Sequence, residues 1–135
     1  MSTLDNIRIA RTFLEGVGGG RDPIEIAAPF ADDLIYDFQG DTEALPWIGR
    51  RTGRTAVEHF IADLRSLTET VSFAVEDILA SDSRAAIVGA LATRIKATNR
   101  TTSTQFAIIL TIAGETITRF QMIEDSYDVS RAARL

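Results

Sequence analysis

The chain has 135 residues with 14 basic and 19 acidic side chains, and this acidic balance (formal net charge −5) argues against a surface for nucleic acid or anionic membranes. Its length fits one domain, residues 1–135, and its 45% hydrophobic and 24% charged residues are typical of a globular protein. The lack of cysteine excludes disulfides and thiol chemistry, and the single histidine, His59, excludes a metal centre with several histidines from one chain.

The N-terminus does not have the pattern of a targeting signal. Residues 1–15 contain four charged side chains, so the continuous apolar run of a signal peptide is missing. No stretch of the sequence reaches the roughly 20 apolar residues that span a bilayer. We therefore expect a cytoplasmic protein that does not enter a membrane.

Three helices are predicted in the first half of the chain. Apolar residues recur at helical spacing over 4–17, and a glycine-rich run at 16–20 ends this helix. A glycine loop that holds phosphate follows a strand, whereas this run follows a helix, so we interpret it as a helix terminator. Capping patterns predict a short second helix over 22–28 and a third helix over 55–67.

Strands dominate the rest of the chain. A short strand is predicted at 34–38 and a loop at 40–54. In the second half, apolar and polar residues alternate, which predicts four long strands separated by turns at 81–83, 98–100 and 113–115. Tight turns join antiparallel strands, and helices that precede the sheet indicate the α+β class.

Three stretches resemble a known group of proteins: LIYDFQG at 34–40, PWIGRRTGRTAVEHF at 46–60 and ETITRFQMIEDSYDV at 115–129. With the order of elements, they make nearly the whole chain similar to the nuclear transport factor 2-like superfamily, which includes ketosteroid isomerase and the SnoaL-like polyketide cyclases. The resemblance implies a cone-shaped curved antiparallel sheet packed against three N-terminal helices (cystatin-like/NTF2-like). It also implies an apolar pocket for a small molecule and a homodimer through the outer face of the sheet. It identifies the fold and not the reaction.

Asp37 is the first candidate for a catalytic group. In the alternation of its strand it lies opposite Tyr36 and Phe38. An apolar pocket raises the pKa of an aspartate from about 3.9 and makes the carboxylate a better proton acceptor near neutral pH. Where YDFQG is laid on ketosteroid isomerase, the resemblance puts Asp37 on the general base that moves a proton beside a carbonyl. The alternative is a strand-end aspartate that is solvated or caps a backbone amide.

The other groups of the isomerase site have no counterpart. That enzyme stabilises its dienolate with a tyrosine of the first helix, where this chain has Phe13, and with a protonated aspartate of a central strand, where it has Gln105 and apolar neighbours. Because both oxyanion donors are missing, we do not expect steroid isomerisation. The Asp-Arg-Asp site of limonene epoxide hydrolase is not matched either, since Arg94 is followed two residues later by Lys96.

Three aromatic residues are candidates for the pocket wall. Trp47 lies in a loop that borders the pocket mouth in relatives, and it either meets the ligand or seals the core. Phe13 and Phe60 are expected in the core, with outer edges that line the pocket.

Three polar residues are candidates for ligand contacts. Gln105 lies on a strand that is apolar on both faces and that we expect to be central. Gln121 is a hydrogen-bonding group of the pocket if its strand face is concave, and belongs to the dimer interface if that face is convex. Asp125 either orients a pocket group or caps the C-terminal segment Ser130 to Leu135.

Two functional hypotheses follow. In the first, a SnoaL-like enzyme without metal or organic cofactor isomerises, cyclises or dehydrates an apolar cyclic substrate after Asp37 removes a proton. In the second, the chain is a non-catalytic ligand-binding or dimerisation module on the same fold. The missing oxyanion donors favour the second hypothesis, and Asp37 in its strand favours the first.

Overall fold

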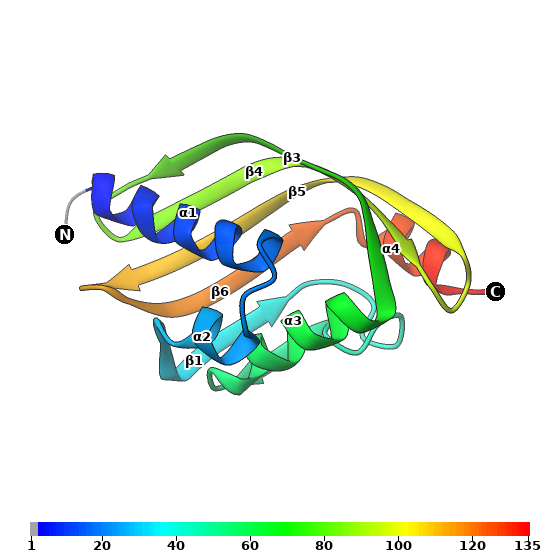
Figure 1. The fold of residues 1–135 in the computed structure, drawn as a ribbon, viewed down its shortest axis with the longest axis horizontal. Coiled ribbons are helices and arrows are strands. Elements are labelled where there is room, and N and C mark those ends of the chain that lie inside the picture. Colours follow the sequence, from blue (N-terminus) through cyan, green and yellow to red (C-terminus); the bar gives the residue numbers. More distant parts are fainter. Residues whose placement is uncertain (1–2) are drawn as a thin grey trace.

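Helices cover one face of a curved sheet in the computed structural model, which describes residues 3–135 (Figure 1). The three predicted helices are confirmed to within one residue at each end, and a fourth, α4, was not predicted. None of the helices in residues 3–135 is both long and apolar enough to cross a membrane. In chain order the elements are α1 (Thr3–Gly18), α2 (Pro23–Ala27), β1 (Phe30–Phe38), β2 (Gly49–Thr52), α3 (Thr55–Leu67), β3 (Thr68–Ala80), β4 (Arg84–Ile95), β5 (Arg100–Ala113), β6 (Thr116–Glu124) and α4 (Ser126–Ala133).

The sheet has the strand order β2-β1-β6-β5-β4-β3. All neighbouring strands are antiparallel except β1 and β6, which are parallel. The α+β class is confirmed, but the sheet is mixed rather than purely antiparallel. Tight turns fix the direction of β3 to β6 only. Strand β1 joins β6 from a distant part of the sequence, so no turn determines its direction.

The predicted loop at 40–54 contains a strand. Within it, β2 pairs with β1 from Phe38 opposite Gly49 to Ile35 opposite Thr52. Its sequence, GRRT, is mostly exposed and has no apolar alternation, so period-2 analysis does not detect it. Strand β1 also begins earlier than predicted, at Phe30.

Side chains of the sheet alternate between a helix-covered face and an outer face. The Tyr36 ring stacks on Phe120 of β6 at 5.4 Å and is tilted against Phe60 of α3 at 6.4 Å, so these residues belong to the helix-covered face. Asp37 lies opposite Gln121 in the pairing of β1 with β6. Because alternate residues of a strand point to opposite sides, Asp37 and Gln121 belong to the outer face.

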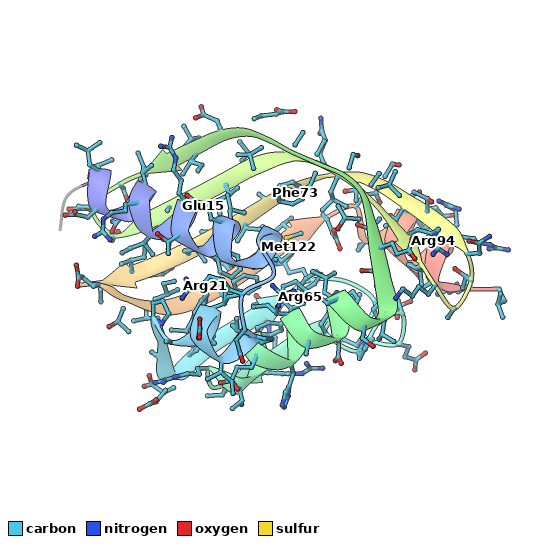
Figure 2. The ribbon with its side chains drawn as sticks, in the orientation of Figure 1. Glu15, Arg21, Arg65, Phe73, Arg94 and Met122 are labelled. Carbon is cyan, nitrogen blue, oxygen red and sulfur yellow. The ribbon has the colours of Figure 1, made fainter. Side chains whose placement is uncertain are left out.

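Arg65 of α3 joins its helix to the end of α1 and to the connection that leads to α2. Its guanidinium donates to the backbone carbonyls of Gly16 (3.3 Å), Val17 (3.0 Å) and Arg21 (2.5 Å). These carbonyls lie at and after the C-terminal end of α1, where helix carbonyls lack partners within the helix. Figure 2 shows Arg65 between α3 and the connection from α1 to α2. A cation at this end of α1 also favours the helix dipole.

Gly89 lets β3 and β4 approach closely. A Cβ at this position would overlap the carbonyl oxygen of Ala74 in β3. The pairing of the two strands is irregular between Val75 and Asp77, as at a β-bulge. Bulges bend a strand and increase its twist, so this contact contributes to the curvature of the sheet.

Candidate functional site

An open groove of about 500 Å³ lies where β5 and β6 separate. Pairing of the two strands ends at Phe106 opposite Glu124, and β5 continues beyond this point with β4 alone. The volume falls within the range of small-molecule sites. The groove is lined by both strand ends: Ser103, Thr104, Gln105, Phe106, Ala107, Ile123, Glu124 and Asp125. Gln105 and Asp125 are thus brought together in one groove.

Glu124 is the last residue of β6. It follows Phe120 and Met122 in the alternation of the strand, so it belongs to the helix-covered face. Met122, buried on that face, is labelled in Figure 2. Within residues 3–135, the carboxyl group of Glu124 has no hydrogen bond or ion pair. A half-buried acid without a partner is unusual in a folded protein.

The protonation of Glu124 is perturbed by its surroundings. Burial, with a smaller contribution from the negative charge of Asp125, raises the pKa of the Glu124 carboxyl from 4.5 to about 7. At neutral pH the group is therefore a mixture of acid and carboxylate. Such a group can accept or donate a proton under physiological conditions.

Aromatic surface lies beside this carboxyl. Phe106, opposite Glu124 in the sheet, stacks on Phe73 of β3 with ring centroids 5.0 Å apart and planes inclined by 21°. The Phe73 side chain is 46% exposed, so part of this aromatic surface is open to solvent. Figure 2 shows Phe73 at the middle of β3. An apolar ligand beside Glu124 would find a surface to pack on.

Asp125 caps α4. Its side chain accepts a hydrogen bond from the backbone N–H of Asp128 (3.1 Å), and its own N–H donates to the hydroxyl of Thr104 (2.8 Å). The segment that Asp125 caps is thus the helix α4, which begins at Ser126 and already contains Ser130. The capping contact places Asp125 in a structural role at the edge of the groove.

Two further carboxylates hold α4 in place. Asp128 accepts from the Thr102 hydroxyl (2.7 Å) and the Ser103 N–H (3.0 Å), and these hydrogen bonds lower its pKa. Asp41 accepts from the Ser130 hydroxyl (2.7 Å), which is the main reason that its pKa is lowered. Helix α4 is thus fixed beside the groove by interactions with β5 and with the connection from β1 to β2.

Asp37 lies elsewhere, on the outer face of the sheet. Its carboxylate is 6% exposed and forms loose ion pairs with Arg50 of β2 (3.7 Å) and Arg119 of β6 (3.8 Å). It does not line the groove described above. Gln121, beside it, is also on the outer face, which is the position that the dimer interpretation requires. The catalytic role of Asp37 stays a prediction.

Trp47 and Phe60 belong to the aromatic core. Their rings meet edge to face at 5.8 Å, and both side chains are buried. The Trp47 carbonyl accepts a hydrogen bond from the hydroxyl of Tyr36 (2.7 Å), and burial raises the pKa of that hydroxyl. Phe13 lines a different cavity, between α1 and α2. The structure therefore does not gather the predicted pocket residues into one site.

Glu124 is the residue that sequence analysis missed. It continues the apolar series Phe120 and Met122 on one face of the last strand, and an acid at such a position is a recognisable signal. For metal binding, residues 3–135 contain no group of three or more histidine or acidic side chains that could hold an ion.

Comparison with known proteins gives matches over most of the chain. A family model described as a SnoaL-like domain matches residues 10–120. Among solved structures, the chain is similar to an NTF2-like protein from Burkholderia xenovorans, with 25% identity, 99% of each chain covered and a TM-score of 0.88. No curated protein matches the chain.

Two further structures share the fold at lower identity. One is an LEH-like epoxide hydrolase from M. tuberculosis, with 18% identity, 97% of this chain and 90% of that chain covered, and a TM-score of 0.73. The other is a hypothetical protein with a ketosteroid isomerase-like fold from Catenulispora acidiphila, in complex with trimethylamine. It has 20% identity, covers 93% of this chain and 91% of its own, and gives a TM-score of 0.72.

Proposed function

The chain belongs to the SnoaL-like domain family of the nuclear transport factor 2-like superfamily, as its resemblance predicted, and on this premise we propose that it moves a proton on a small, largely apolar molecule. Glu124 is the proposed acid–base group. The reaction is an isomerisation, cyclisation or dehydration of a cyclic substrate. The observation that carries this proposal is a half-buried carboxyl in a groove, without a partner in residues 3–135 and with a pKa of about 7.

The chemistry favours Glu124 over Asp37 as the base. A base is most effective when its pKa lies near the working pH, because it is then both available as carboxylate and strong enough to take a proton. Asp37 lies outside the groove, on the outer face of the sheet, and its carboxylate is already engaged by two guanidinium groups, of Arg50 (3.7 Å) and Arg119 (3.8 Å). No cation of the described residues 3–135 pairs with Glu124, which lies opposite Phe106 in the sheet.

Nitrobenzisoxazole tests this assignment without knowledge of the substrate, because its ring opens to a coloured phenolate when a base removes its carbon-bound proton. We expect the protein to accelerate this reaction, with a rate that rises with pH through an apparent pKa of about 7. Glu124→Gln should lower the rate at least about 100-fold, the usual contribution of a positioned base. Absorbance of the product gives the rate.

Asp37→Asn is the matched control, since it also replaces a carboxylate by its amide. It should leave the rate and the pH profile unchanged. If Asp37→Asn abolishes turnover and Glu124→Gln does not, Asp37 is the base and our assignment is wrong. If neither substitution changes the rate, proton transfer by these carboxylates is excluded for this probe.

A second candidate function is binding without chemistry. The uncompensated carboxyl of Glu124 beside Phe106 also suits a small organic cation, which is attracted by negative charge and by aromatic faces. The similar fold from Catenulispora acidiphila was solved with trimethylamine. Two results together would favour this alternative. Calorimetry would detect binding of trimethylammonium, and the protein would not accelerate the ring opening of nitrobenzisoxazole.

We also propose that two chains form a homodimer through the outer face of the sheet. This face carries partly exposed apolar side chains, including Ile35 and Ile109, around the buried carboxylate of Asp37. Contact between two copies would remove them from water, and a stable interface of this kind buries about 1,600 Å².

Sedimentation at micromolar concentration should give twice the monomer mass of 14.8 kDa. Ile109→Arg puts a charge in the centre of the proposed interface and should yield monomers, because an unpaired buried charge is costly. Leu4→Arg, at an exposed position of α1, should remain dimeric. A monomeric wild type, or a dimeric Ile109→Arg, contradicts this interface.

A further inference from the structure

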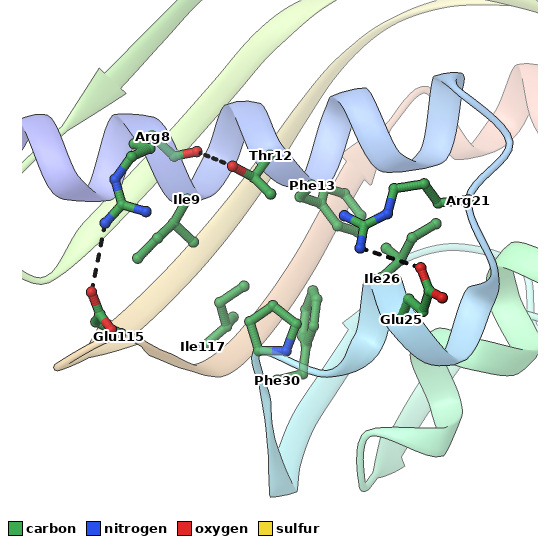
Figure 3. Close-up of a pocket in the computed structure, with 11 residues that line it drawn as sticks. Arg8, Ile9, Thr12, Phe13, Arg21, Glu25, Ile26, Phe30, Glu115 and Ile117 are labelled. Atoms are coloured by element: carbon green, nitrogen blue, oxygen red, sulfur yellow. Dashed lines mark hydrogen bonds and ion pairs between the residues drawn. The ribbon is translucent and has the colours of Figure 1, made fainter.

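A second cavity lies at the opposite end of β6 from the groove. It has a volume of about 210 Å³ and is enclosed by α1, α2 and the beginning of β6 (Figure 3). Ile117 in its wall and Glu124 in the groove are separated by seven positions of one strand, or about 23 Å at ~3.3 Å per residue. The cavity is therefore a site separate from the one proposed for catalysis.

The wall of this cavity is apolar. Phe13 of α1 meets Phe30 of β1 edge to face, with ring centroids 5.7 Å apart. Aliphatic side chains complete the wall, and all of the following are buried: Ile9, Phe13, Ile26, Phe30 and Ile117. The rings are held by the rest of the aromatic core, so the apolar shape exists before any ligand binds. A preformed cavity lowers the entropic cost of binding.

The rim of the cavity carries charges that are already balanced. Arg8 pairs with Glu115 at 3.6 Å, and Arg21 pairs with Glu25 at 3.4 Å. Figure 3 shows these two pairs on either side of the opening, with Thr12 between them. The Thr12 hydroxyl donates to the Arg8 carbonyl (2.9 Å), and its oxygen still has a lone pair that can accept a hydrogen bond.

We propose that this cavity binds a small uncharged molecule with an apolar, ring-sized body and one hydroxyl or similar hydrogen-bonding group. The volume is below the range of about 300–1,000 Å³ that holds drug-sized ligands, which limits the body to about one ring. Among the described residues that line the cavity, all four charged side chains are paired, so an ionic head group would lose hydration there without gaining a free counter-charge. A hydroxyl can use the lone pair of Thr12 without disturbing either ion pair.

Benzyl alcohol is a suitable probe, because benzoate and benzylammonium share its skeleton and differ in charge. NMR spectra of the isoleucine methyl groups show where the probe binds in the wild-type protein, because the chemical shifts of methyl groups near the ligand change. We expect shifts at Ile9, Ile26 and Ile117 and none at Ile123 of the groove, with a dissociation constant of about 0.1–1 mM for a ligand of this size. Both charged analogues should bind at least about 10-fold more weakly.

Thr12→Trp should fill the opening and weaken benzyl alcohol binding at least about 10-fold. Arg11→Trp is the control, since Arg11 is the exposed neighbour of Thr12 on the same helix and does not line the cavity. The proposal is overturned if millimolar benzyl alcohol shifts none of the three methyl groups. It is equally overturned if Ile123 shifts instead, if the charged analogues bind as well, or if Thr12→Trp binds normally. None of these results affects turnover by Glu124, which is measured separately.

Discussion

Replacing Glu124 with glutamine should make the protein more stable than the wild type at pH 8, by about 3 kcal/mol. The carboxyl has a pKa of about 7 in the folded protein, against a reference value of 4.5. One pKa unit corresponds to about 1.4 kcal/mol, which gives this magnitude. Glutamine has nearly the same shape and no charge, so it removes the cost of holding a carboxylate in this half-buried position.

The direction of the effect depends on pH. Below pH 4.5 the carboxyl is protonated in both the folded and the unfolded chain, and it contributes no pH dependence. Between pH 4.5 and 7 the unfolded chain loses this proton while the folded chain retains it, so the wild type loses stability as the pH rises. Above pH 7 both states are ionised and the loss is complete. Glu124→Gln should lack this decline.

Urea unfolding at several pH values between 4 and 8 measures this difference. Glu76→Gln is the matched control, because Glu76 is an exposed glutamate of β3, and its substitution should leave the pH dependence intact. A Glu124→Gln curve parallel to that of the wild type would show that the carboxyl is not perturbed in the folded state. A gain in stability together with a loss of turnover is the expected signature of a residue kept for chemistry.

Sequence periodicity was sufficient for the long elements. The helices α1 and α3 and the four strands of the second half each show enough repeats of their own period to be recognised, whereas the five-residue helix α2 was predicted from its capping pattern. Strand β2 has only four residues. It is a strand because it pairs with residues Ile35 to Phe38 of β1, and this pairing depends on tertiary structure rather than on the local sequence. The parallel pairing of β1 and β6 also depends on how distant segments pack, so no local pattern contains it.

Local sequence patterns are also insufficient to identify the residues of the candidate site. Alternation separates Asp37 from Tyr36, and Glu124 from Ile123, but it does not say which face the helices cover. Phe60 of α3 packs against Tyr36, which shows that the Tyr36 side of β1 is the helix-covered face. Because Tyr36 pairs with Phe120 and stacks on it, the Phe120 side of β6 belongs to the same face. Only then does Glu124 stand out as an acid on the helix-covered face and Asp37 as one on the outer face.

Phe120→Ala should remove about 3–5 kcal/mol of stability, the usual cost of a buried phenylalanine. Phe120 is fully buried, and its ring lies at the centre of the aromatic core. The ring centroids around it belong to Phe13 (6.0 Å), Phe30 (6.3 Å), Tyr36 (5.4 Å) and Phe60 (6.0 Å). These residues come from α1, β1 and α3, so a cavity at Phe120 would remove packing contacts of both helices with the sheet.

A loss of this size is a large part of the stability of about 5–15 kcal/mol that a domain has. The melting temperature of Phe120→Ala should fall by about 10–20 °C, measured by calorimetry. Phe73→Ala is the matched control: it deletes the same atoms from a side chain that is 46% exposed and stacks on one ring, and it should cost about 1 kcal/mol. Equal losses in the two variants would mean that the aromatic core is loosely packed around Phe120. The helices would then not be held on the sheet by these rings, and the face on which Glu124 lies would have no fixed cover.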